Sequence, residues 1–219
     1  LTSANTTADT GFYMKRIIRS IFTALLAALL LSLSLASCGG GKPQETVDLP
    51  EQRIDYAAAV RLDMSSATAK QQVTVKTFID GDTTHFYVPS SVILGGVLKA
   101  RYLAVNTPES TGKIEEWGKK ASSFTKDKLS SASSIIVESD SEKWEADSTG
   151  SRYLAWVWYR TSESEEYRNL NIELLQNGLA IASSAANNRY GKTCVAAIAQ
   201  AKEQKLNLYS GEKDPDFYY

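Results

Sequence analysis

One short loop constrains this chain more than any other stretch. Residues 73–78 have the composition and partial alternation of a β-strand, and Ile79-Asp80-Gly81-Asp82-Thr83 follows directly. Asp80 and Asp82 are two positions apart, so on an extended chain their carboxylates point the same way. Two adjacent carboxylates repel each other unless a cation lies between them. The loop therefore predicts either a metal site or a hairpin turn, since Asp-Gly is a common turn dipeptide.

A second stretch, one hairpin later, favours the metal site. It begins at Arg101 and ends with Asn106-Thr107-Pro108-Glu109. It therefore offers amide, carbonyl and carboxylate oxygens beside a guanidinium. Hard cations prefer such oxygen ligands. We expect the two stretches to form one site.

The N-terminus predicts export. Residues 1–13 are interpreted as an upstream extension, and residues 14–37 as a signal peptide with a basic start and an apolar run at 21–36. The end of this run, Leu35-Ala36-Ser37-Cys38, resembles a bacterial lipobox, in which cleavage before the cysteine leaves it N-terminal and lipidated. A transmembrane anchor is the alternative, but a spanning helix needs about 20 apolar residues and this run is shorter.

From this we expect an exported protein, lipid-anchored at Cys38 to the bacterial cell envelope, with its domain outside the cytoplasm. Residues 38–72 are mostly polar and predict a tether that keeps the domain clear of the membrane. The domain itself is expected over 73–212, which is long enough to bury a core. Residues 213–219 predict a flexible tail.

Charge and side-chain content exclude several kinds of site. The chain has 24 basic and 25 acidic residues, and residues 1–37 hold three basic residues and one acidic residue, so the mature chain carries 21 and 24, a net charge of −3. Phosphate contacts favour positive surface, so a nucleic-acid site would need a local basic patch. With Cys38 lipidated, Cys194 has no disulfide partner. His85 is the only histidine, which argues against zinc and Ser-His-Asp chemistry, and we expect it to be structural.

The remaining pattern predicts a mixed order of strands and helices. Strands are expected at 73–78, 84–88, 99–105, 135–138 and 153–159. Helices are expected at 115–132, through Leu170 and Leu175 up to a Gly178 cap, and around 194–201. Five short strands with helical inserts suit an α+β fold built on a five-stranded OB-type β-barrel.

Six stretches, taken in this order, resemble the thermonuclease family, whose type member is staphylococcal nuclease. They are 79–83, Arg101 with 106–109, 117–126, 152–155, Asn171 with 176–180, and 205–208. The likeness covers about 73–209 with compatible spacing. It implies an OB-fold barrel with three helices. It also implies a Ca²⁺-dependent phosphodiesterase that acts on DNA and RNA and leaves 3′-phosphate ends.

The resemblance also implies a metal site. Asp82 would be a direct calcium ligand, and Asn106 stands at the position of a second carboxylate ligand. Thr107 would offer its backbone carbonyl, and Asp80 would reach the metal through water. Asn106 replaces an aspartate of the family pattern, so one negative charge is lost while an oxygen ligand remains.

Three further residues are implied to be catalytic. Glu109 resembles the proposed general base, and Arg101 and Arg152 resemble the pair that grips the scissile phosphate. The chemistry agrees, because a guanidinium fork meets two phosphate oxygens at once and a glutamate can deprotonate water. Taken alone, either arginine would more often be a surface ion pair, and Glu109 a helix-start acid.

Two departures affect the substrate side of the site. The loop before Arg152 differs from the family spacing by about one residue. Ser183 and Ser184 stand where the type enzyme places two tyrosines against the nucleotide, and Tyr190 is a nearby candidate to replace them.

Two alternatives to an enzyme stay open. One is a nuclease-like module that binds nucleic acid or a protein without turnover. The other is a purely structural lipoprotein. Retention of the predicted catalytic side chains favours a nuclease, which we expect to be a monomer.

Overall fold

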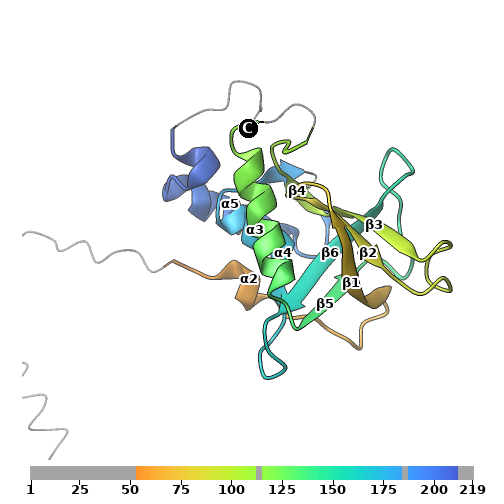
Figure 1. Ribbon diagram of the computed structural model, residues 1–219. Coiled ribbons are helices and arrows are strands. Elements are labelled where there is room, and N and C mark those ends of the chain that lie inside the picture. Colours follow the sequence, from red (N-terminus) through yellow and green to blue (C-terminus); the bar gives the residue numbers. More distant parts are fainter. Residues whose placement is uncertain (1–52, 112–114, 184–186, 212–219) are drawn as a thin grey trace, which may run out of the picture. The chain divides into compact units, whose positions relative to one another are not determined.

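The computed structural model describes residues 53–111, 115–183 and 187–211 (Figure 1). In these ranges the strands are β1 (Lys70–Phe78), β2 (Thr83–Tyr87), β3 (Val97–Tyr102), β4 (Ala104–Asn106), β5 (Ser134–Glu138), β6 (Tyr153–Arg160), β7 (Arg168–Asn169) and β8 (Ile181–Ser183). The helices are α2 (Tyr56–Ala59), α3 (Gly118–Ser130), α4 (Leu170–Gln176), α5 (Gly191–Glu203) and a 3-10 turn, Asn207–Tyr209.

Five strands close into a barrel. Their order is β3-β2-β1-β5-β6, and a parallel pairing of β3 with β6 joins the two ends. The first part of β1 pairs with β5 and its second part with β2, and a register shift between Val75 and Thr77 marks the bend. With α3, α4 and α5, this barrel confirms the predicted α+β fold of the OB type.

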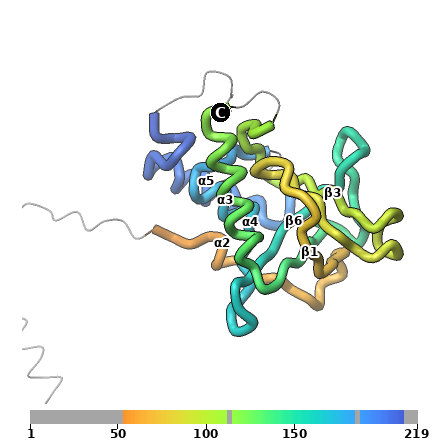
Figure 2. Tube along the Cα trace, viewed as in Figure 1, coloured from red at the N-terminus to blue at the C-terminus, as the bar shows by residue number. Residues whose placement is uncertain are grey.

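The helices gather on one side of the barrel (Figure 2). All seven residues of α4 are buried, because the helix packs against α5, α2 and β6. Gly178 ends α4 as predicted: its φ is 62°, and Leu179 N donates to Leu174 O at 3.0 Å. A side chain would not fit there, since a Cβ on Gly178 would lie 2.4 Å from Leu206 O.

The predicted strand over 99–105 is broken in two. Ala104 has a φ of 67°, so the chain leaves β3 after Tyr102 and forms β4, which pairs with β8. The buried amide of Asn171 donates to Leu103 O at 2.9 Å and to Ala155 O at 3.0 Å. Because these bonds come from a residue far along the chain, local pattern could not reveal the break.

The segment from Arg53 to Ala69 contacts the barrel domain. Both carboxylate oxygens of Asp55 accept from Arg168, at 2.8 and 3.0 Å. Ala57 is fully buried, and its N–H donates to Gln176 Oε1 at 3.0 Å. The predicted tether over 38–72 therefore includes a docked portion, and the extent of the tether before residue 53 stays a prediction.

The predicted signal peptide, Cys38 and the tail at 213–219 lie outside the described residues. Among the residues that are described, no helix has the length and apolar character needed to cross a membrane.

Candidate active site

The carboxylate loop is wedged between α3 and the strand end at Thr107. Gly81 O accepts from Thr125 Oγ1 of α3 at 2.6 Å. A Cβ on Gly81 would lie 2.8 Å from both Ala121 Cβ and Thr107 Cγ2. The glycine is thus required by close packing, which holds the carboxylates on either side of it at a fixed place.

Asp82 is the buried centre of the site. Its side chain is 6% exposed, and its Oδ2 accepts from Thr107 N at 2.8 Å. Its Oδ1 accepts from Thr83 Oγ1 at 3.1 Å. A guanidinium nitrogen of Arg101 lies 2.5 Å from Oδ2 and pairs with the carboxylate.

Arg101 also reaches Asn106. Its Nη2 donates to Asn106 Oδ1 at 2.9 Å, and its Nη1 donates to Val105 O at 3.0 Å. One guanidinium therefore bridges Asp82 and Asn106. The two side chains predicted as calcium ligands converge on a single positive group.

Asp80 adds a second carboxylate beside Asp82. Its Oδ1 accepts from Asp82 N at 3.2 Å. Burial, together with the charge and a side-chain hydrogen bond of Asp82, raises the pKa of Asp80 to about 7. A second negative charge beside Asp82 is therefore unfavourable in this buried position, and a cation bound there would favour it.

The donor set fits a hard cation such as Ca²⁺. It comprises two carboxylates, the Asn106 amide oxygen and Thr107, whose buried Oγ1 has no hydrogen-bond partner among the described residues. Within the same residues, no three His, Cys, Asp or Glu side chains gather as a metal site. A metal here would thus depend on amide and carbonyl oxygens as well as on carboxylates.

Glu109 shares this electrostatic environment. Burial and the charges of Asp82 and Glu115 raise its pKa, and Arg101 and Arg152 oppose that rise. The positive charges of Arg101 and Arg152 therefore both affect the pKa of Glu109, the predicted base. A raised pKa suits a carboxylate that has to accept a proton.

Arg152 is held by a residue that sequence reasoning missed. Asp147 Oδ2 lies 2.7 Å from Arg152 Nε, and Asp147 Oδ1 accepts from Thr149 Oγ1 at 2.7 Å. Because Asp147 engages the Nε side, the two terminal nitrogens are the part of the fork that can meet a phosphate. An aspartate followed by a threonine two positions later is typical of an Asx turn, and Thr149 N donates to Asp147 Oδ1 at 3.2 Å. This signal could have predicted that the Asp147 side chain is fixed within the loop, but not its contact with Arg152.

Both arginines line one cleft of about 470 Å³. Its other lining residues include Leu103, Asp140, Glu145, Leu154, Ser183, Asn187 and Asn188. Tyr190 is not in this lining, and its ring packs edge-on against Trp156 and Trp158, with centroid distances of 5.0 and 5.7 Å. Tyr190 therefore does not replace the family's two tyrosines at the cleft.

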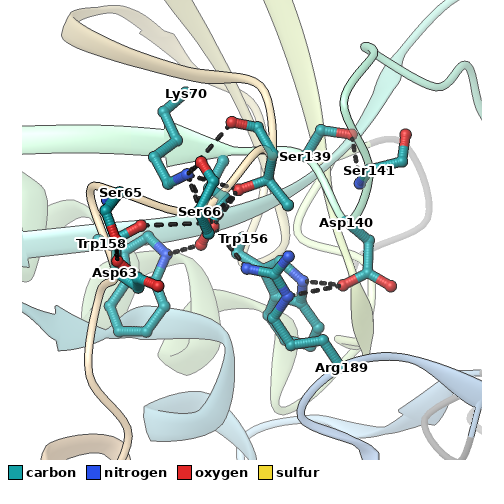
Figure 3. A network of polar contacts seen from close by, with 12 residues as sticks. Asp63, Ser65, Ser66, Lys70, Ser139, Asp140, Ser141, Trp156, Trp158 and Arg189 are labelled. Atoms are coloured by element: carbon teal, nitrogen blue, oxygen red, sulfur yellow. Dashed lines mark hydrogen bonds and ion pairs between the residues drawn. The ribbon is translucent and has the colours of Figure 1, made fainter.

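A polar network holds part of the cleft lining in place. Glu138 is fully buried at the end of β5, and its Oε1 lies 2.7 Å from Arg189 Nη1. Its Oε2 accepts from Trp158 Nε1 at 2.9 Å. Figure 3 shows Lys70, Trp158 and Arg189 in this network, together with Asp140 of the cleft. Since Arg189 follows Asn187 and Asn188 directly, the network positions their side of the cleft.

Residues 99–211 match the family described as staphylococcal nuclease homologue. The chain belongs to this family. The matched stretch contains Arg101, Asn106, Glu109 and Arg152, and it begins after the carboxylate loop. The recognition made from sequence motifs is thereby confirmed.

One relative is itself described as a nuclease. The chain is 32% identical over 161 residues to Endonuclease YhcR of Bacillus subtilis (strain 168). The aligned part covers 68% of this chain and 12% of that protein, so the chain corresponds to a small part of a much longer relative. Together with the staphylococcal nuclease family match, this relative supports the predicted class of nuclease-type phosphodiester hydrolases.

Proposed function

We propose that this member of the staphylococcal nuclease family is a Ca²⁺-dependent nuclease. It hydrolyses phosphodiester bonds in DNA and RNA and leaves 3′-phosphate ends. It acts outside the cytoplasm, lipid-anchored at Cys38. The observation that carries the proposal is that Arg101, which contacts both Asp82 and Asn106, lines the same cleft as Arg152.

The two arginines bind the scissile phosphate. A diester is negatively charged, and its charge grows as a nucleophile attacks. Arg101 lies in β3 and Arg152 in the loop directly before β6, so they can contact the phosphate from two sides. Calcium bound at Asp82 and Asn106 would supply further positive charge at the same phosphate.

Glu109 activates the attacking water. Its carboxylate takes a proton from the water as the water oxygen bonds to phosphorus. The bond from phosphorus to the 5′-oxygen breaks, and that oxygen gains a proton as it leaves. The phosphate stays on the 3′-oxygen, which accounts for the proposed product.

Arg101 has to bind the phosphate as well as its present partners in the protein. In the structure it is paired with Asp82 and Asn106, and its fork must turn from these oxygens to meet a phosphate. Lysine at this position would keep the charge but lose the fork. Arg101 should therefore tolerate no replacement by lysine.

The product ends test the chemistry. A soluble chain that begins after Cys38 is incubated with an oligonucleotide in calcium, and the products are analysed by mass spectrometry. The proposal predicts fragments with 3′-phosphates and free 5′-hydroxyls from both DNA and RNA. Fragments with 5′-phosphates would contradict the proposed bond cleavage, and binding without fragments would favour a non-catalytic module.

A further inference from the structure

We propose that the outer face of β1, β2 and β3 is a binding surface for single-stranded nucleic acid that leads into the cleft at Arg101. The surface consists of Lys76, His85, Tyr87 and Lys99, and we call it the basic sheet face. The proposal deepens the proposed nuclease function and rests on it for the identity of the bound polymer.

Strand alternation places these side chains on one face with Arg101. On β3, Leu98 and Ala100 are fully buried in the barrel, whereas Lys99 is exposed and Arg101 is partly exposed. On β2, Phe86 is fully buried and Tyr87 is 54% exposed. Residues two apart on a strand share a face, so Lys99 is the outward neighbour of the catalytic arginine, about 7 Å along the strand.

The pairing register brings the two strands together. His85 lies opposite Lys99, and Thr83 lies opposite Arg101. The imidazole and the ammonium group therefore belong to adjacent strands on the same outer face. The sequence predicts a structural role for His85, and the structure places it on this face opposite Lys99.

The bulge in β1 adds Lys76 to the same face. It lies between Val75 and Thr77, where the pairing with β2 shifts. Lys76 Nζ is 5.7 Å from the centroid of the Tyr87 ring. Burial, followed by the charges of Lys99 and Lys76, lowers the pKa of His85. This agrees with the pairing register, which places His85 opposite Lys99.

The charge of the basic sheet face indicates which kind of molecule it binds. In the described ranges, neither Lys76 nor Lys99 forms an ion pair with a carboxylate, so both charges face outward. The predicted mature chain is acidic, so this face supplies the local basic patch that phosphate binding requires. A basic surface with an exposed ring suits a single strand, whose bases can stack on the aromatic side chain.

A charge-matched pair of variants tests the surface. The chain from residue 39 onward is prepared with Lys76→Ala and Lys99→Ala together. The control carries Lys192→Ala and Lys202→Ala on α5, which lies on the helical side of the domain (Figure 1). Lys202 resembles Lys76 in lying over a tyrosine ring, 5.4 Å from the centroid of Tyr209.

Binding is measured with a fluorescent 12-nucleotide single strand in chelator, so that cleavage does not interfere, over a series of salt concentrations. Each phosphate contact contributes about 0.7 to the slope of log affinity against log salt for a single strand. The sheet-face pair should therefore lower the slope by about 1.4 and weaken binding roughly tenfold at low salt. The α5 pair should bind as the parent does.

His85 gives an independent readout, because it is the only histidine of the chain. Its imidazole proton resonances in the parent should shift on addition of the oligonucleotide and saturate at the same concentration as the fluorescence signal. Imidazole resonances of His85 that do not shift would contradict the proposed binding surface. So would a Lys76→Ala, Lys99→Ala variant that binds with the affinity and salt slope of the parent.

Cleavage of a dinucleotide by the parent in calcium tests the proposed function separately. A dinucleotide is too short to cover both the cleft and the sheet face. Cleavage of it together with lysine-dependent binding of the long strand supports both proposals. Lysine-dependent binding without any cleavage would support the surface and overturn the nuclease.

Discussion

Replacement of Glu138 by glutamine should be among the most destabilising single changes in the domain. The carboxylate is fully buried and contacts four groups from three parts of the chain. Arg189 Nη1 lies 2.7 Å from it, Trp158 Nε1 at 2.9 Å, Thr68 Oγ1 at 2.6 Å, and Lys70 Nζ at 3.7 Å. Glutamine keeps the size of the side chain but removes its charge and one acceptor oxygen.

The expected magnitude follows from what is left behind. The Lys70 side chain is 8% exposed, so it loses its carboxylate in a place that water hardly reaches. Breaking a buried ion pair by changing one partner costs about 3–5 kcal/mol. For a domain of this size, each 1 kcal/mol lowers Tm by about 2–4 °C. Glu138→Gln should therefore lower Tm by about 6–20 °C.

The assay is thermal and urea unfolding followed by tryptophan fluorescence and circular dichroism. Glu166→Gln is the matched control, because it breaks a pair with Arg61 whose side chains are 65% and 79% exposed. Exposed pairs contribute roughly 0–1 kcal/mol, so this control should unfold close to the parent. A Glu138→Gln protein as stable as the Glu166→Gln protein would refute the assignment of Glu138 as the anchor of this network.

Three further predictions concern the site and its location. Arg101→Lys and Arg152→Lys should each reduce turnover on DNA by orders of magnitude with Tm nearly unchanged, because lysine cannot form the bidentate contact; near-normal rates would remove that arginine from the site. Burial tends to raise the pKa of Asp147, but bonds from Thr149 and Arg152 outweigh it and hold the pKa at about 2. Since this folded value lies below the usual 3.8, the stabilising contribution of Asp147 is present above about pH 4 and is lost as the pH falls toward 2. Asp147→Asn should remove that part of the acid sensitivity and reduce turnover on DNA, and an unchanged acid profile of unfolding would contradict the grip on Arg152. Cys38→Ala should move the full chain from the membrane to the soluble fraction, since a lipidated cysteine is the proposed anchor; a variant that fractionates with the membrane would exclude the lipobox.

Much of the fold could be predicted because its elements are encoded locally. The partial alternation in β1, the aromatic and apolar run of β6, the helical spacing in α5 and the Gly178 cap all depend on neighbours along the chain. The break at Ala104 could not be predicted, because the hydrogen bonds from Asn171 that hold it come from another part of the structure. Docking of the segment at Asp55 was likewise hidden, since its partner Arg168 is 113 residues away.

Most residues of the candidate site could be predicted from the sequence, but several of their contacts could not. Sequence motifs indicated Asp82, Arg101 and Arg152, and the structure brings them to neighbouring positions. The bridging of Asp82 and Asn106 by Arg101 depends on side-chain conformations that no motif specifies. Asp147 was missed because its role lies in a loop whose length differs from the family spacing.

Calcium titration of DNA cleavage tests the central claim most directly. The parent, Asn106→Asp and Asp82→Ala are compared under the same conditions, with chelator as the blank. The parent should cleave only with calcium. Asn106→Asp should reach half-maximal rate at a lower calcium concentration, because a charged ligand strengthens an oxygen-ligand site. Asp82→Ala should show no metal-dependent cleavage. Cleavage that persists in chelator, survives in Asp82→Ala, or shows the same calcium demand in Asn106→Asp would contradict a metal site built on Asp82 and Asn106.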